Sequence, residues 1–139
     1  MRAVETVAIP GTLPGVGQAI DACDRFGRSH GVPSRAAWRL LLALDEILSN
    51  IVRHGGGGSA DIDVTFSVED GAVSVDVVDS GAAFNPLLAP APDTTSLLER
   101  RPAGGLGIAL VRQLMDDTQY ERRNERNHFR MTIDVHGHR

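Results

Sequence analysis

The segment of residues 61–79 is the feature that most limits the possible folds. Residues 61–69, DIDVTFSVE, alternate strictly between apolar and polar side chains, and residues 72–79, AVSVDVVD, supply a second β-type segment. The Asp70-Gly71 dipeptide between them is typical of a two-residue hairpin turn. The chain therefore contains an antiparallel hairpin, and its fold must cover at least one face of that hairpin.

Other periodic segments surround the hairpin. Helical spacing begins at Pro14 and ends near Gly31, and it recurs in two later segments; β-type spacing marks three further segments. The later helices are expected at 35–54 and 105–116, and the strands at 4–9, 119–123 and 128–135, the last two joined by a turn around Asn124 to Asn127. Strands that pair by hairpins, with helices grouped between them, predict an α+β fold: a two-layer sandwich of a mixed, mostly antiparallel sheet of about five strands with helices on one face.

Length and composition restrict the class of protein. The chain has 139 residues, enough for a single domain (1–139) with a real core. A net charge of −4 gives no basic field for nucleic acid or an anionic membrane, and no apolar run is long enough to span a bilayer. Cys23 is the only cysteine, which excludes an internal disulfide and indicates a reducing compartment. We expect a cytoplasmic protein that binds neither nucleic acid nor membrane.

Residues 81–105 lack periodicity and contain four prolines. Loops of this length inside a compact domain are usually lids, binding segments or disordered. We therefore expect a lid at about 82–104.

Three polar residues lie along the apolar face of the helix expected at 35–54. Glu46, Asn50 and His54 follow one another at four-residue steps and form a stripe just outside one margin of an apolar arc of about 140°. This stripe suits the wall of a binding pocket. The alternative is a solvated Glu-Asn pair, with His54 interacting with the dipole at the end of the helix.

Two glycine motifs supply further candidate residues. In VVDSGAAFNP, Asp79 ends a buried strand and Gly81 follows, so a carboxylate at the rim of the sheet can accept a hydrogen bond from an exocyclic amine; an ordinary Asp-Ser-Gly turn is the alternative. In AGGLGIALV, a glycine-rich turn leads directly into a helix, an arrangement that binds anions through free backbone N–H groups. The second motif is neither the dinucleotide fingerprint nor the phosphate loop that ends in Lys-Ser or Lys-Thr.

The three motifs in this order resemble the N, G1 and G2 boxes of the GHKL-type (Bergerat) ATP-binding fold shared by gyrase, Hsp90 chaperones, histidine kinases and MutL. Within that fold, ALDEILSNIVRHG, DSGAAFNP and GGLGIALVRQLMDDTQYERRNERNHFRMTI are most similar to the anti-sigma-factor serine/threonine kinases of the RsbW and SpoIIAB type. The resemblance covers essentially the whole chain.

The resemblance implies a role for each matching residue. Glu46 would act as the general base or orient the attacking group, and Asn50 would bind the Mg²⁺ of ATP. Asp79 would accept from the adenine amino group, with Gly81 letting the base lie close. Four residues, Gly104, Gly105, Leu106 and Gly107, would bind phosphates, and Thr132 would lie near the adenine.

The resemblance also implies partners: a sigma factor or similar regulatory target, a STAS-domain anti-anti-sigma antagonist that is phosphorylated in partner switching, and a second copy of the chain in a homodimer. Two features depart from the family pattern. Gly56 to Gly58 replace an aromatic residue often found after His-Gly, and Arg100 and Arg101 are separated from Gly104 by Pro102.

We expect an ATP-dependent serine/threonine protein kinase. The two departures leave one alternative open, a non-catalytic ATP-binding regulator that acts only by association. The ATPase lobe of a histidine kinase is disfavoured, because no pair of dimerisation helices with a phosphoacceptor His precedes the first strand.

Overall fold

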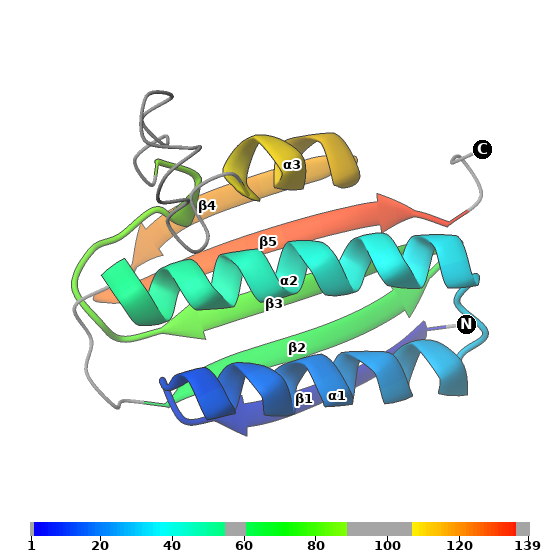
Figure 1. The fold of residues 1–139 in the computed structure, drawn as a ribbon, viewed down its shortest axis with the longest axis horizontal. Helices are drawn as coiled ribbons and strands as arrows, with labels where there is room; N and C mark the ends of the chain where they lie inside the picture. Colours follow the sequence, from blue (N-terminus) through cyan, green and yellow to red (C-terminus); the bar gives the residue numbers. More distant parts are fainter. Residues whose placement is uncertain (1, 55–60, 89–106, 136–139) are drawn as a thin grey trace, which may run out of the picture.

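A five-stranded sheet forms one layer of the protein (Figure 1). The computed structural model describes residues 2–54, 61–88 and 107–135. Their elements, in chain order, are β1 (Arg2–Ile9), α1 (Leu13–Ser29), α2 (Ser34–His54), β2 (Ile62–Glu69), β3 (Ala72–Asp79), the 3₁₀ helix η1 (Pro86–Leu88), α3 (Gly107–Leu114), β4 (Asp117–Arg123) and β5 (Arg126–Asp134).

The strand order is β1-β2-β3-β5-β4, and every neighbouring pair is antiparallel. The predicted hairpin is confirmed: Asp70 and Gly71 have φ values of 52° and 79°, the left-handed pair that a tight two-residue turn between twisted strands requires. The expectation of a mixed sheet is wrong for the described strands. Local patterning predicts the strands but not the directions in which distant strands pair, so it could not show that β5 is antiparallel to β3.

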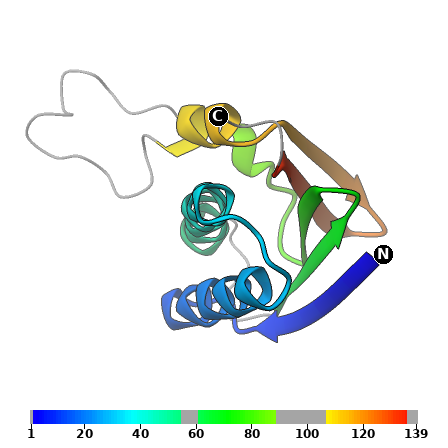
Figure 2. The ribbon, with the colours of Figure 1, turned by 90° about the vertical axis from the view of Figure 1, so that its right-hand side faces the viewer.

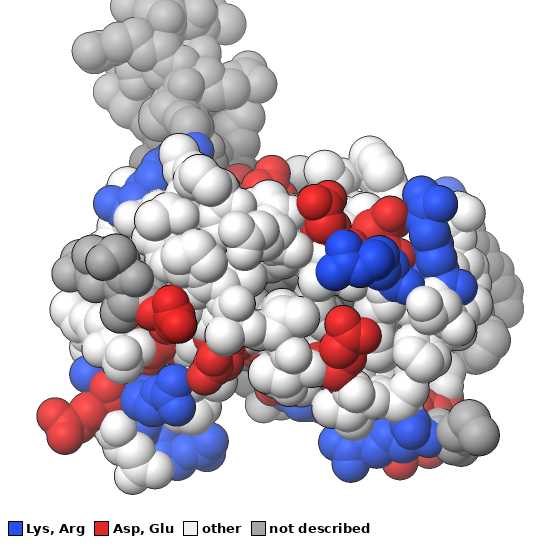
Figure 3. All heavy atoms as spheres, turned by 90° about the horizontal axis from the view of Figure 1, so that it is seen from below, with Lys and Arg blue, Asp and Glu red and all other residues white. Residues whose placement is uncertain are grey.

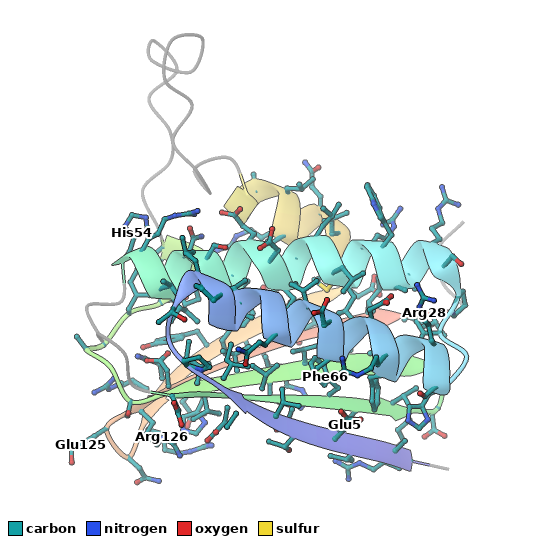
Figure 4. The ribbon with its side chains drawn as sticks, turned by 60° about the horizontal axis from the view of Figure 1, so that its bottom comes forward. Glu5, Arg28, His54, Phe66, Glu125 and Arg126 are labelled. Carbon is teal, nitrogen blue, oxygen red and sulfur yellow. The ribbon has the colours of Figure 1, made fainter. Side chains whose placement is uncertain are left out.

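The three helices cover one face of this sheet, as predicted (Figure 2). Alternation along β3 directs Val73, Val75 and Val77 into the core, and Asp79 is on the same face at the end of the strand. Phe66 from β2 lies between the sheet and the helices and is fully buried (Figure 4). The apolar face of α2 packs over these side chains, so the polar stripe on α2 lies close to the edge of the core.

Helix α1 begins where the chain leaves the edge strand. The Thr12 side chain caps it by accepting a hydrogen bond from the Gly15 N–H at 3.2 Å. Gly15 also allows a close approach, because a Cβ there would lie 2.0 Å from the Pro10 carbonyl oxygen. The position of α1 over the sheet therefore depends on a residue without a side chain.

The second hairpin differs from the prediction in its turn. Asn124 and Glu125, with φ values of 55° and 60°, form a two-residue turn, and β5 begins at Arg126. Asn127, which we expected in the turn, is therefore the second residue of β5 and pairs with Asp79 across the sheet.

The first part of the predicted lid is attached to the core. After β3 the chain reaches η1, where Pro86 is buried and Phe84 and Leu87 pack against the core. Residues 89–104 of the predicted lid lie outside the described residues. The limits of the lid and the assignment of 1–139 to a single domain remain predictions.

Candidate functional site

Helix α2 presents different polar residues to its two sides. It packs between α1 and α3 (Figure 2). Asp45, Ser49 and Arg53 line a groove of about 700 Å³ against α1. Glu46 follows Asp45 and Asn50 follows Ser49, so each is rotated by about 100° around the helix axis from the groove residue before it. The residues of the predicted stripe are therefore not among those that line the α1 groove.

The stripe contains buried polar atoms without partners. Asn50 is only 1% exposed, and Glu46 is partly buried. Neither Glu46 Oε2 nor Asn50 Nδ2 completes a hydrogen bond with the residues that the structure describes. An unsatisfied buried polar group costs about 1–3 kcal/mol, so a binding partner for these atoms would recover a substantial free energy. The solvated-pair alternative is therefore wrong for Asn50, which is enclosed.

The surroundings of Glu46 favour its protonated form. Burial raises the pKa of its carboxyl above the ordinary value of 4.5. The nearby Asn50 amide lowers the pKa in part, although its Nδ2 atom makes no full hydrogen bond; Asp45 raises the pKa again, and Arg53 lowers it. A carboxylate with a raised pKa is a stronger base, so the ionised form of Glu46 is better suited to accept a proton.

Within residues 2–54, 61–88 and 107–135, the hydrogen bonds to the Asp79 carboxylate fall on one of its two oxygens. Its Oδ1 atom accepts from the Gly81 N–H at 3.0 Å and from Asn127 Nδ2 at 2.9 Å. The first bond is that of an ordinary Asp-Ser-Gly turn, so this alternative describes the local backbone correctly. Both bonds fall on Oδ1, and no described residue donates to Oδ2, which can therefore accept from a ligand.

Asn127 is a site residue that sequence reasoning missed. Its Nδ2 donates to Asp79 Oδ1 and, at 2.9 Å, to the Ala82 carbonyl oxygen; its Oδ1 accepts from the Phe84 N–H at 3.1 Å and from the Tyr120 hydroxyl. The available signal was the alternation of Phe129, Met131 and Ile133, which continues back to position 127 once the turn is shortened.

Two further contacts close the site. Arg122 of β4 donates from Nη1 to the Gly81 carbonyl oxygen at 2.8 Å. His54 lies at the end of α2 (Figure 4), and the centroid of its ring is 6.3 Å from that of the Phe84 ring. The start of α3 at Gly107 is at the same end of the molecule as the end of α2 and the loop after β3 (Figure 1). The loop, α2 and β5 therefore meet at one place.

Some predicted residues are not placed with this group. Gly104, Gly105 and Leu106 lie outside the described residues, and their role remains a prediction. Thr132 is described, and the prediction for it is wrong in this structure. It is five positions from Asn127 along β5 and so on the opposite face of the sheet, where its hydroxyl is 3.0 Å from that of Ser74.

The residues present fit a nucleotide with Mg²⁺. No group of three or more His, Cys, Asp or Glu side chains suited to a metal is found in 2–54, 61–88 and 107–135. A magnesium ion that keeps water and phosphate ligands needs only one or two protein oxygens, and the Asn50 amide is of that kind. At the end of β3, Asp79 offers a carboxylate oxygen, Oδ2, to which no described residue donates.

Comparison with known proteins identifies the family. The family described as histidine kinase-like ATPase domain matches residues 9–133. This chain belongs to that family. As a histidine kinase-like ATPase domain, it is 36% identical over 101 residues to the serine/threonine-protein kinase BtrW of Bordetella bronchiseptica (strain ATCC BAA-588 / NCTC 13252 / RB50), a match that covers 71% of each chain.

A solved structure has the same fold as this histidine kinase-like ATPase domain. It is the crystal structure of the RsbU and RsbW domains of Rv1364c from Mycobacterium tuberculosis, with a TM-score of 0.68 and 15% identity. The match covers 94% of this chain and 32% of the solved one, so the chain spans about a third of that protein. The predicted α+β fold is confirmed by this likeness.

Two surface properties complete the description. No helix in the described part of the chain combines the length and the apolar character needed to cross a membrane. The face seen in Figure 3 carries interspersed acidic and basic side chains, so it offers no field of a single sign.

Proposed function

We propose that this protein is a serine/threonine protein kinase of the anti-sigma-factor type. It binds Mg-ATP and transfers the terminal phosphoryl group to a serine of a STAS-type antagonist. The observation that carries the proposal is that Glu46 Oε2 and Asn50 Nδ2 are buried without a partner among the described residues. They belong to α2, whose last residues lie at the same end of the molecule as Asp79, the last residue of β3 (Figure 1). The similarity to a protein named as a serine/threonine kinase supports it.

The base of the nucleotide would bind at Asp79. Its free Oδ2 atom accepts a hydrogen bond from the adenine amino group, and Gly81 leaves room beside it for the ring. A hydrogen bond to an ionised acceptor is stronger than one between neutral groups, which suits recognition at the rim of a pocket.

The phosphates would bind toward α3. The Asn50 amide oxygen would hold Mg²⁺, and backbone N–H groups of Gly104, Gly105, Leu106 and Gly107 would bind phosphate oxygens at the start of the helix. The sequence contains no lysine, so Arg is its only side chain that stays fully cationic at neutral pH. We assign contact with the terminal phosphate to Arg100 or Arg101 on this ground.

Glu46 would act as the general base. When bound, Mg-ATP supplies the phosphoryl group and the charge neutralisation that phosphoryl transfer requires. The Glu46 carboxylate would accept the proton of the serine hydroxyl while the serine oxygen bonds to the terminal phosphorus and ADP leaves. Burial, which raises the pKa of this carboxyl, favours that proton transfer.

Phosphorylation would control association. A phosphoserine adds about −1.5 to −2 charge, which disrupts an interface where it meets acidic groups or loses water. We propose that the unmodified antagonist competes with a sigma factor or similar target for this protein, and that the modified one is released. We place these events in the cytoplasm and expect the protein to act as a homodimer.

A transfer assay tests the kinase. Purified protein, labelled Mg-ATP and STAS-domain proteins of the same genome are mixed, and phosphoserine is quantified. Glu46→Gln should reduce transfer by roughly 10²–10⁴-fold, the usual contribution of a general base, while nucleotide binding persists. Asp45→Asn is the matched control, since Asp45 is the adjacent carboxylate but faces the α1 groove.

Equal rates for the parent and Glu46→Gln would reject the assignment of the base. Absence of transfer to any STAS protein, with Mg-ATP binding intact, would favour the second candidate, a non-catalytic ATP-binding regulator. The displaced Arg100-Arg101 pair favours that candidate. Sequestration of the target should then survive Glu46→Gln unchanged. Binding itself is measured by thermal shift: ligand at about 100 times its Kd adds roughly 2.7 kcal/mol.

A further inference from the structure

We propose that Asn127 is the positioning residue that sets the purine preference of the site, by fixing Asp79 and joining it to the start of the loop that leads to the predicted lid. This inference rests on the proposed binding of ATP. It concerns a residue of β5 that does not itself contact the nucleotide.

The Asn127 amide is fully occupied by protein partners. A primary amide has two N–H donors and an oxygen with two lone pairs. Both donors are used, by Asp79 Oδ1 and the Ala82 carbonyl, and the oxygen accepts from the Phe84 N–H and the Tyr120 hydroxyl. Asn127 is 3% exposed. With no capacity left for a ligand, its part in binding must be to position other groups.

The group it positions most directly is the Asp79 carboxylate. Asp79 and Asn127 face each other across β3 and β5, so the amide reaches Oδ1 from a fixed strand. The Gly81 N–H binds the same oxygen. Two donors on Oδ1 oppose rotation of the carboxylate and leave Oδ2 as the acceptor for a ligand. An acceptor oriented before binding loses less conformational freedom when the ligand arrives.

The same amide also holds the backbone that follows Asp79. It binds the Ala82 carbonyl and the Phe84 N–H, while Arg122 holds the Gly81 carbonyl. Tyr120 and Arg122 both belong to β4, the edge strand beside β5. Three neighbouring strands of the sheet therefore hold the turn, and Asn127 in the middle strand is hydrogen-bonded to Asp79, Ala82 and Phe84.

The chemical consequence is selectivity for a purine that carries an amino group. An oriented carboxylate oxygen accepts from the 6-amino group of adenine, but it has nothing to accept from a purine that lacks this group. If Asn127 no longer fixes Asp79, the carboxylate turns and this distinction is lost, even where the remaining contacts of the nucleotide persist.

The test uses Asn127→Asp, which keeps the shape and both acceptor functions but removes both donors. It also places a second carboxylate beside Asp79, which disfavours the ionised acceptor. Dissociation constants are measured for ATP and for purine riboside triphosphate, which lacks only the amino group. The preference for ATP should fall by about tenfold or more, the effect of losing one hydrogen bond to a charged group.

A second readout needs no nucleotide. Amide hydrogen exchange at Gly81, whose N–H binds Asp79 Oδ1, should accelerate in Asn127→Asp. Thr132→Val is the matched control: it removes a hydroxyl from the same strand on the opposite face, and it should leave both the preference and the exchange unchanged. If Asn127→Asp does not fold, Asn127→Ser is measured in the same way: it replaces the amide by a single hydroxyl, which reaches fewer partners.

The outcomes separate this inference from the proposed function. A reduced preference together with faster exchange at Gly81 supports it. Equal weakening of both nucleotides, with an unchanged ratio, overturns the role of Asn127 and leaves ATP binding in place. A parent protein that binds ATP and the analogue equally overturns the adenine contact of Asp79 as well, while one that binds no nucleotide overturns both proposals.

Discussion

The two faces of the sheet treat their polar side chains differently. On the open face these side chains pair with one another: Arg130 Nη1 lies 2.7 Å from Asp76 Oδ2, and the hydroxyls of Thr6 and Thr65 are 2.9 Å apart. On the covered face Asp79 and Asn127 are bonded to each other, but Glu46 and Asn50 of the helix layer have buried atoms with no partner among the described residues. On the open face, His128 Nε2 is also buried with no hydrogen-bond partner among the described residues.

This difference helps to distinguish polar residues that only support the fold from polar residues that bind a ligand. Except for His128 Nε2, the open-face groups named above have water and neighbours as partners, so their pairing contributes little to stability. Covered groups are removed from water, and leaving them unpaired costs stability. Such groups persist where a ligand or another segment supplies the missing partner. The covered face is therefore where function is to be sought.

The largest expected contrast compares two adjacent residues of β2. Phe66 is fully buried on the covered face, and Phe66→Ala should lower the free energy of unfolding by about 3–5 kcal/mol through lost burial and a cavity. Thr65→Ala, on the open face, should cost about 1 kcal/mol or less, the net value of one hydroxyl hydrogen bond. Urea unfolding measures both. Equal losses would show that the two faces contribute alike to stability.

A smaller contrast concerns how α1 lies over the covered face. Gly15→Ala should destabilise by roughly 1–3 kcal/mol, because its Cβ meets the Pro10 carbonyl and overpacks the start of the helix. Gly17→Ala meets no atom within 4 Å and should instead stabilise by about 0.5–1 kcal/mol through reduced backbone entropy of the unfolded chain. Thermal unfolding should give shifts of opposite sign. A stable Gly15→Ala variant would contradict the close approach.

The smallest expected effect concerns two carboxylates whose neutralisation should change the stability in opposite directions. The folded-state pKa of Glu46 is raised above 4.5, so its favourable contribution is complete below that pH and is lost as pH rises through the raised value. Without nucleotide, Glu46→Gln should therefore stabilise the protein at neutral pH and not in acid. Asp76→Asn, which removes the charge opposite Arg130, should slightly destabilise at neutral pH. Melting temperatures across pH 4–8 test this, and a Glu46→Gln curve parallel to the parent would refute it.

Much of the fold could be predicted because its signals are local. Strict alternation and an Asp-Gly turn specify the β2–β3 hairpin without reference to the rest of the chain, and the same is true of the apolar face of α2. The sheet order could not be obtained in this way. The position of β5 between β3 and β4 depends on contacts between residues far apart in sequence.

The site shows the same division. Glu46, Asn50 and Asp79 carry residue types and spacings that point to a pocket, and the structure places them at the edge of the core. Asn127 could not be separated from its turn, because the polar run ERRNERN allows the reversal at several positions and only pairing with β3 fixes it. Thr132 was assigned by resemblance alone, and a five-residue difference from Asn127 puts it on the wrong face.

The pairing of β1 has a consequence for biosynthesis. Arg2 pairs with Glu69 and Ile9 with Ile62, so two whole helices separate this strand from its partner in the chain. A nascent polypeptide exposes β1 and the apolar faces of α1 and α2 to solvent until the β2–β3 hairpin has left the ribosome. That interval is when this chain is most vulnerable to aggregation, and it is when chaperone binding would help it most.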